Sequence, residues 1–238
     1  GSIMWTGANV LKNATGYNLT QLVVGSEGTL GLVTKIVLKL IPHPKHDLLM
    51  LVPFNDLEKA GEAVSAIFRA GYTPSALELV EIDALKIVSA MVQSAAVPVT
   101  DDMAAHLIIE VDGNNHETLM AEMMAIGHLL SEYGCGEIFF AEDAQQKAEL
   151  WKLRRRVAEA VKLDGYTIEE DTVVPRAELP ALIKGVKELA IRYDFKAVCY
   201  GHAGDGNLHI RIKKAGSIFS LNNPEVIPAL TALFELVK

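Results

Sequence analysis

The stretch of the sequence with the most chemical potential is "CYGHAGDGNLHIRI" at residues 199–212. A Gly-Asp-Gly turn separates His202 from His209, and the flanking residues alternate between apolar and polar types, as strands do. If the two strands pair as a hairpin, both imidazoles can converge on a divalent metal. Asp205 and Asn207 then lie in the turn, where they hold its backbone or orient a histidine. Two ligands do not complete a metal site, so a tight Asp-Gly hairpin whose histidines only end the strands is the alternative.

A second stretch, "GYNLTQLVVGSEGTLGLVT" at residues 16–34, is rich in glycine. Clustered glycines let backbone N–H groups approach a phosphate or a flat ring closely. The spacing matches neither the GxGxxG dinucleotide motif nor a Walker loop. From the residues alone, a glycine-rich turn before a strand is the simpler interpretation.

The third stretch, "AELWKLRRRVAEAVK" at residues 148–162, has the periodicity of a helix. Its core-facing stripe is predicted to consist of Leu150, Leu153, Val157 and Val161. Arg154 flanks this stripe, so its guanidinium either reaches a cleft and binds a carboxylate or belongs to a solvated face. Two interpretations are also open for the acidic residues Glu169, Glu170 and Asp171. They form either an acidic cluster near a site or ordinary surface charge.

Strand and helix patterns alternate from residue 45 onward. The first helix is predicted to begin at Asn55, with Glu58 as its capping-box partner, and to stop at Gly71. Two strand–helix–strand units side by side predict a ferredoxin-like α+β domain, with a mostly antiparallel sheet covered by helices. The predicted strands are 48–54, 75–81, 105–113, 137–142 and 166–174. The predicted helices are 55–70, 82–93, 116–134, 143–163, 178–193 and 224–238.

The segment "LVTKIVLKLIP" at residues 32–42 precedes this domain. Its apolar and polar residues alternate, which predicts a half-buried strand ended by the prolines at positions 42 and 44. We therefore expect a domain boundary here, with residues 1–42 on one side and residues 43–238 on the other.

Composition limits the partners of the protein. Its 238 residues carry a formal net charge of −8, which disfavours nucleic acid because phosphate binding needs clustered Lys and Arg. Cys135 and Cys199 form no CxxC motif and no disulfide framework, so a reducing, cytoplasmic setting is the default expectation. No apolar run approaches the ~18 residues of a membrane-spanning helix, and the N-terminus lacks the pattern of a signal peptide.

Taken together, these stretches resemble the flavin-dependent 2-hydroxyacid dehydrogenases and oxidases of the vanillyl-alcohol-oxidase type. That group includes the glycolate oxidase D subunit, D-lactate dehydrogenase and D-2-hydroxyglutarate dehydrogenase. "KNATGYNLTQLVVGSEGTLGLVTKIVLKLIP" is similar to the end of their PCMH-type FAD-binding domain. "ELWKLRRRVAEA", "EEDTVVPRAELP" and "GHAGDGNLH" are similar to successive landmarks of their substrate-side, or cap, domain.

The resemblance implies roles for the residues of the first and third stretches. In this family the paired histidines help to hold a divalent metal, often zinc, so His202 and His209 are expected to be catalytic residues and metal ligands. The family's third ligand is a glutamate in a later "GEHG"-like motif, which these 238 residues do not contain. Arg154 matches the arginine that binds the substrate carboxylate, and Asn207 is expected to contact the substrate too.

The resemblance also implies an FAD site, of which this chain holds only a part. The backbone of the glycine-rich stretch would line the flavin, and the expected contacts are Gly25, Ser26, Gly28, Gly31 and Val33. Because the half of the flavin domain that grips the pyrophosphate is expected elsewhere, we predict that this chain by itself is inactive.

Two departures from the family bear on the substrate. D-2-hydroxyglutarate dehydrogenases carry a threonine and a lysine for the distal carboxylate, where this chain has Ala158 and Glu169, so a five-carbon diacid is disfavoured. Instead, the stretch that follows resembles the glycolate oxidase branch. Asn18 stands where the family usually has aspartate, which puts that local contact in doubt.

The activity implied for the full-length protein is oxidation of a small 2-hydroxy acid, glycolate or D-lactate, to the 2-oxo acid, with hydride transfer to FAD. The resemblance is compatible with an electron-acceptor or iron–sulfur partner subunit, with a homodimer, and with a peripheral position at the inner membrane. The competing hypothesis is a non-catalytic metal-binding or interaction module with a ferredoxin-like core.

Overall fold

The computed structural model describes residues 1–92, 97, 99–214, 224 and 226–238. The chain divides into two compact units, Gly1–His43 and Pro44–Lys238. The first unit contains one short helix, α1 (Leu19–Val23), which the sequence analysis did not predict. The Asn18 side chain accepts a hydrogen bond from the Gln21 backbone N–H and caps this helix, as asparagine commonly does.

The predicted strand at residues 32–42 is wrong, because the segment is irregular in the structure. Ile36, Leu38 and Leu40, which the alternation assigned to a buried face, are 71%, 73% and 86% exposed. A strand is stabilised by hydrogen bonds and side-chain pairs with a neighbouring strand, and none of the described residues supplies one to this segment.

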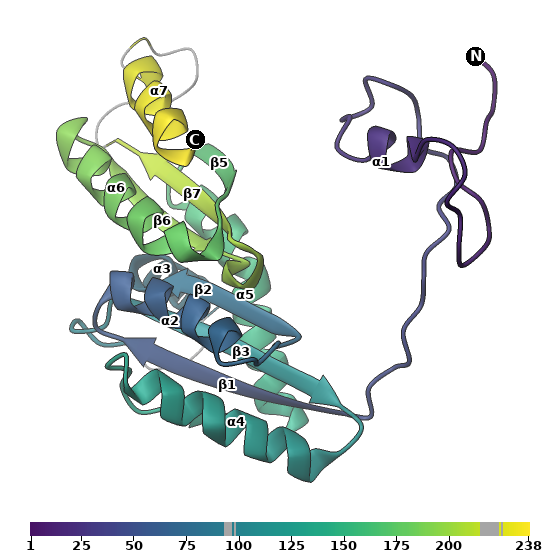
Figure 1. The fold of residues 1–238 in the computed structure, drawn as a ribbon. Helices are drawn as coiled ribbons and strands as arrows, with labels where there is room; N and C mark the ends of the chain where they lie inside the picture. Colours follow the sequence, from purple (N-terminus) through teal and green to yellow (C-terminus); the bar gives the residue numbers. More distant parts are fainter. Residues whose placement is uncertain (93–96, 98, 215–223, 225) are drawn as a thin grey trace. The chain divides into compact units, whose positions relative to one another are not determined.

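The second unit is built on a seven-stranded sheet in the order β4-β1-β3-β2-β6-β7-β5, in which neighbouring strands are antiparallel (Figure 1). Its strands are β1 (His46–Phe54), β2 (Ala76–Glu81), β3 (Ala105–Gly113), β4 (Phe139–Phe140), β5 (Ile168–Val173), β6 (Lys196–Gly201) and β7 (Asn207–Lys213). The order of the first four strands is that of a ferredoxin-like domain, which confirms the predicted fold class.

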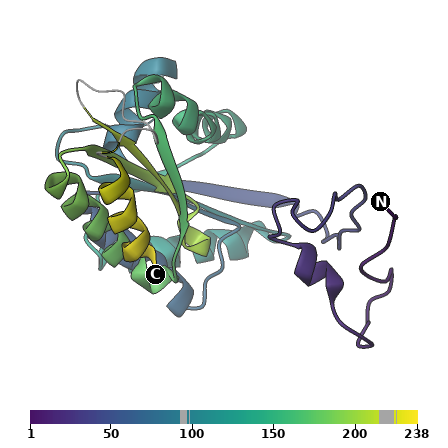
Figure 2. The ribbon, with the colours of Figure 1, turned by 90° about the horizontal axis from the view of Figure 1, so that it is seen from above.

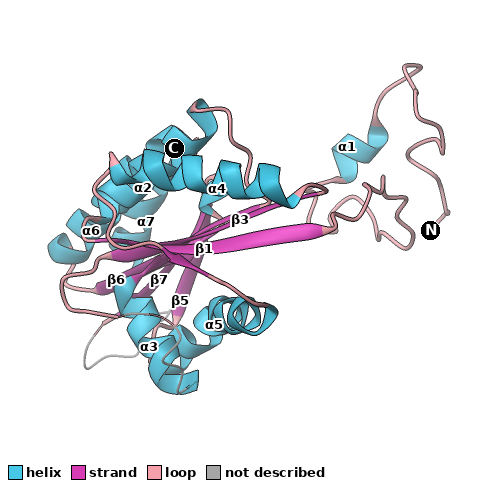
Figure 3. Cartoon of the chain, turned by 90° about the horizontal axis from the view of Figure 1, so that it is seen from below, coloured by secondary structure: helices cyan, strands magenta, loops and turns pink. Residues whose placement is uncertain are grey.

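Helices cover both faces of this sheet (Figure 3). One face carries α2 (Leu57–Arg69), α4 (His116–Ser131), α6 (Leu179–Arg192) and α7 (Val226–Val237). Figure 2 shows α6 and α7 side by side on this face, where they contact each other. The other face carries α3 (Ile82–Val92) and α5 (Ala144–Leu163). We call the first the closed face and the second the site face.

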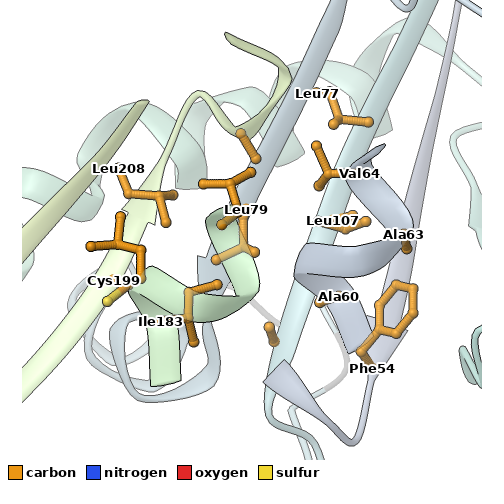
Figure 4. Close-up of a cluster of buried hydrophobic side chains, with 14 of the residues drawn as sticks. Phe54, Ala60, Ala63, Val64, Leu77, Leu79, Leu107, Ile183, Cys199 and Leu208 are labelled. Carbon is orange, nitrogen blue, oxygen red and sulfur yellow. The ribbon is translucent and has the colours of Figure 1, made fainter. Parts of the chain in front are cut away.

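The closed face buries most of the apolar core. Leu79 and Leu107 of the sheet are fully buried beside Ala60, Ala63 and Val64 of α2 (Figure 4). On the site face, the predicted stripe of α5 packs against Val80, Ile108 and Val198 of the sheet. All four residues of this stripe are buried, as their helical spacing predicted: Leu150, Leu153, Val157 and Val161.

The boundaries of the elements differ from the predicted ones in detail. The N-cap of α2 is Asp56 rather than Asn55, and its Oδ1 accepts hydrogen bonds from the N–H groups of Glu58 and Lys59. The predicted strand at 137–142 is reduced to the two residues of β4. Gln93, the predicted last residue of α3, lies outside the described residues, as does Glu225 before α7.

Candidate active site

Polar side chains gather on the site face where strands β2, β6, β7 and β5 lie side by side. Because successive side chains of a strand point to opposite faces, one face receives Glu78 of β2, Tyr200 of β6 and His209 of β7. Arg154 reaches the same group from α5, and His202 from the turn after β6. The structure therefore brings together the predicted site residues Arg154, His202 and His209.

Glu78 is the centre of this group, and the sequence analysis missed it. Its side chain is only 7% exposed, and Oε2 accepts a hydrogen bond from Arg154 Nε at 2.8 Å and forms a salt bridge with Arg154 NH2 at 2.7 Å. Oε1 lies 2.6 Å from Nδ1 of His202. The Arg154 side chain is 11% exposed, so it does not belong to a solvated face. A single carboxylate thus joins the predicted carboxylate-binding arginine to the first histidine.

Tyr200, a second residue that was missed, forms the floor of the site. It is fully buried, and its ring stacks on His209 with 5.5 Å between ring centroids. The Arg154 guanidinium carbon lies 5.8 Å from the same ring centroid. The hydroxyl accepts a hydrogen bond from Nε of Arg211 at 3.1 Å. Burial raises the pKa of Tyr200, although Arg211 acts in the opposite direction, so the phenol stays neutral.

His209 is surrounded by carboxylates from strand β5. Its Nδ1 is 3.3 Å from Glu169 and 3.7 Å from Asp171, and it forms no hydrogen bond with the described residues. Glu169 also forms a salt bridge with Arg211. Glu169 and Asp171 therefore form an acidic cluster at the site. The strand alternation places Glu170 on the closed face, where burial raises its pKa.

The turn between the two histidines is held by its backbone. The carbonyl oxygen of His202 accepts hydrogen bonds from the N–H groups of Asp205 and Asn207. Gly206 adopts φ +81°, and a Cβ at this position would lie 2.0 Å from the carbonyl oxygen of Val174, so only glycine fits here. The Asn207 amide donates to Oδ1 of Asp171 at 2.6 Å and to the Thr172 carbonyl. Both of these bonds hold the hairpin against β5.

The two histidines predicted to bind a metal lie close to each other. Their ring centroids are 6.5 Å apart, with the rings at 69°. Each ring has Nδ1 beside a carboxylate, and such contacts orient the imidazoles of metal sites. In the part of the chain that the structure describes, no group of three His, Cys, Asp or Glu side chains is arranged to hold a metal ion.

The predicted FAD contacts lie in the unit Gly1–His43. Gly25 and Gly28 have positive φ angles of +82° and +77°, which fit the glycine-rich turn that the sequence predicted. The N–H of Thr29 donates to the carbonyl oxygen of Ser26 and closes the turn between them. Gly31 and Val33 follow in the irregular segment before the second unit.

Comparison with known proteins identifies the family. Residues 43–219 match the family described as FAD linked oxidases, C-terminal domain. The chain belongs to this family. The residues of the candidate site, Glu78, Arg154, His202 and His209, all lie within the matched range. The resemblance to FAD-linked oxidases that the sequence motifs indicated is therefore confirmed.

Two curated relatives are similar over most of the chain. A D-lactate dehydrogenase of Anaerostipes hadrus is 34% identical over 215 residues, which cover 88% of this chain and 45% of that protein. A glycolate oxidase subunit GlcD of Bacillus subtilis is 34% identical over 210 residues, which cover 88% of this chain and 44% of that protein. The chain therefore spans less than half the length of these relatives.

Solved structures share the fold at lower identity. An alkyldihydroxyacetonephosphate synthase superposes with a TM-score of 0.62 at 17% identity and covers 95% of this chain and 45% of its own. A p-cresol methylhydroxylase gives 0.56 at 15% identity, over 82% of this chain and 43% of its own. Among the described residues, no helix is long and apolar enough to cross a membrane.

Proposed function

We propose that this chain supplies the substrate side of the active site of a flavoprotein that oxidises a small 2-hydroxy acid, glycolate or D-lactate, to the 2-oxo acid. The observation that carries the proposal is the guanidinium of Arg154 and the imidazole of His202 on one buried carboxylate, Glu78. The first group suits a substrate carboxylate, and the second suits the neighbouring hydroxyl. The names of the two similar curated relatives agree with this substrate class.

Within this proposal, Arg154 binds and orients the acid. A guanidinium forms two parallel hydrogen bonds to a carboxylate, which fixes the direction of the C1–C2 bond. A histidine accepts the proton of the 2-hydroxyl group, since imidazole suits that task near neutral pH, or a metal-bound base would do so. Bound FAD, which the glycine-rich turn at Gly25–Gly31 would contact, supplies the hydride acceptor.

The charges of the site favour a monocarboxylate. Arg154 is paired with Glu78, and Arg211 is paired with Glu169. A second substrate carboxylate would therefore meet Glu169 and Asp171 rather than an unpaired cation among the described residues of the site. This agrees with the expectation that a five-carbon diacid is disfavoured.

The proposal includes a divalent metal for which this chain supplies two ligands. Zinc is the expected metal because it binds well to nitrogen ligands. His202 and His209 would hold it, and it would lower the pKa of the substrate hydroxyl. Dialysis of the chain against a chelator, followed by elemental analysis, tests this point. Weak retention is expected, whereas one tightly held zinc per chain would require a third ligand.

The main experiment is anaerobic mixing of the full-length protein with a panel of 2-hydroxy acids while the flavin absorbance is followed. We expect bleaching by glycolate or D-lactate and little by D-2-hydroxyglutarate. The His209→Gln variant should lose this reaction, while His116→Gln, at the start of α4, should keep it. If no 2-hydroxy acid bleaches the flavin, the enzyme hypothesis is wrong, and the non-catalytic module becomes the better interpretation.

A further inference from the structure

Glu78 has an unusual position for a carboxylate. It lies in the strand β2, it is buried, and each of its two oxygens has its own partner. Burying a carboxylate is costly unless it is paired and hydrogen-bonded. Here the partners come from two different elements, Arg154 from α5 and His202 from the turn after β6.

His202 depends on this contact for its orientation. Its side chain is 57% exposed. Among the described residues, Glu78 alone forms a hydrogen bond with the imidazole ring. Arg154 depends on it as well, because its hydrogen bond through Nε and its salt bridge through NH2 both run to Oε2 of Glu78. The relative position of the two groups is therefore set through a single side chain.

We propose that Glu78 fixes the spacing between the guanidinium of Arg154 and the imidazole of His202, and thereby selects 2-hydroxy acids over 3-hydroxy acids. This inference rests on the function proposed above. In a 2-hydroxy acid the carboxylate carbon is bonded directly to the carbon that bears the hydroxyl. The groups that recognise the two must therefore be neighbours, as they are when they share one carboxylate. A 3-hydroxy acid has one more carbon between its polar groups.

The unused atoms of both partners fit this role. Glu78 takes the Nε–NH2 edge of Arg154, which leaves the N–H groups of NH1 and the second of NH2 for a substrate carboxylate. Because a carboxylate only accepts hydrogen bonds, we assign the proton of neutral His202 to Nδ1. Its Nε2 then carries the lone pair through which His202 would meet the hydroxyl group, either directly or through a bound metal. Glu78 is thus a positioning residue that acts through Arg154 and His202.

Glu81 provides a matched control on the same strand. It is equally buried but lies on the closed face, where it pairs with Lys187 and accepts a hydrogen bond from the backbone N–H of Cys199. The Glu81→Gln variant removes a buried carboxylate at a comparable structural cost without touching Arg154 or His202.

The contact can be tested in residues 1–238 without flavin. Long-range ¹H–¹⁵N NMR spectra, recorded at a pH where the ring is neutral, report which nitrogen of His202 carries the proton. We expect Nδ1–H in the unmodified chain and in Glu81→Gln, and Nε2–H, the form preferred in water, in Glu78→Gln. A His202 ring that already carries its proton on Nε2 in the unmodified chain would overturn the proposal.

The selectivity is tested in the full-length protein. We expect Glu78→Gln to raise KM and lower kcat together, with about a 100-fold loss of kcat/KM for the 2-hydroxy acid. The ratio of kcat/KM for D-lactate to kcat/KM for 3-hydroxybutyrate should fall about 10-fold or more in the same variant. Glu78→Asp keeps the charge but is one methylene shorter, so it should restore folding without restoring this preference. It also keeps the test valid if Glu78→Gln fails to fold.

The outcomes separate this inference from the function on which it rests. If the full-length protein oxidises no 2-hydroxy acid, the proposed function fails, and the selectivity fails with it. If it is active but Glu78→Gln and Glu81→Gln have the same kinetic constants, only the role of Glu78 is refuted. A narrowed preference in both Glu78 variants, with an unchanged preference in Glu81→Gln, supports the spacing role.

Discussion

The two faces of the sheet use the same residue type in different ways. On the closed face, Glu81 forms a buried pair with Lys187 beneath α6, and burial raises the pKa of its carboxyl group. On the site face, three residues earlier on the same strand, Glu78 holds a guanidinium and an imidazole. The carboxylate of Glu81 links the sheet to a helix, whereas the carboxylate of Glu78 holds Arg154 beside the exposed His202. One strand therefore carries a sheet–helix ion pair on one face and the proposed substrate-binding group on the other.

This difference follows from what covers each face. The closed face buries apolar residues from β1, β2, β3, β6 and β7 beneath its helices. On the site face, the apolar cover of α3 and α5 gives way to a polar network at Tyr200, His209 and Arg211. Substitutions on the closed face should therefore reduce stability, and substitutions on the site face should reduce function.

The largest effect is expected from a cavity on the closed face. Leu79→Ala removes a fully buried side chain from the centre of the core (Figure 4), and such truncations cost about 2–5 kcal/mol of unfolding free energy. Urea denaturation measures this loss. Met124→Ala, on the exposed side of α4, is the control and should change stability by less than about 0.5 kcal/mol. Equal effects of the two variants would contradict the assignment of this core.

The next effect concerns the turn that carries the two histidines. Gly206→Ala must place a Cβ 2.0 Å from the Val174 carbonyl oxygen at a φ of +81°. We expect a loss of about 2–4 kcal/mol, which combines the left-handed conformation with overpacking. Gly71→Ala has a similar φ of +91° but open space around the Cβ, so it should cost only about 1–2 kcal/mol. Thermal melting of both variants isolates the contribution of the close approach.

A smaller but more specific effect is expected at Arg154. Arg154→Lys keeps the charge but cannot pair with Glu78 and also present a planar fork to the substrate. In the full-length protein we expect KM for the 2-hydroxy acid to rise about 10- to 100-fold, which corresponds to about 1.4–2.7 kcal/mol. The buried Glu78 also loses part of its pairing, so the melting temperature should fall modestly. An unchanged KM would exclude Arg154 from substrate binding.

The fold was predictable because its signals are local. The helical spacing of Leu150, Leu153 and Val157 predicts which side of α5 is buried, and no distant residue is needed to interpret it. The alternation at 32–42 is equally regular, yet it forms no strand, because strand formation also depends on a partner that the pattern does not contain. The cap of α2 shows a finer limit, since Asn55 and Asp56 are adjacent residues with the same capping chemistry.

The site was predictable only in part, because its contacts join residues far apart in the chain. Arg154, His202 and His209 were found through family motifs and chain spacing. Glu78 was missed because nothing near it in "SALELVE" indicates that α5 and the histidine turn both reach it. Arg211 had a usable signal, since it follows His209 by two residues in a strand and must share its face.

The smallest predicted effect is a loss of stability at alkaline pH caused by a buried thiol on the closed face. Cys199 is fully buried beside Glu81, and burial raises the pKa of its thiol from 9.0 to about 12. Between these values the unfolded chain loses a proton that the folded chain keeps, so the stability contributed by this thiol falls as the pH rises above 9. From pH 8 to pH 10, the unmodified protein should lose about 1.4 kcal/mol more stability than Cys199→Ala. Urea denaturation of both proteins at the two pH values measures the difference.

Cys135→Ala is the control, because the thiol of Cys135 is only partly buried and should account for less of the pH dependence. A pH dependence that Cys199→Ala leaves intact would show that the alkaline loss comes from other groups, such as the Glu81–Lys187 pair on the same face.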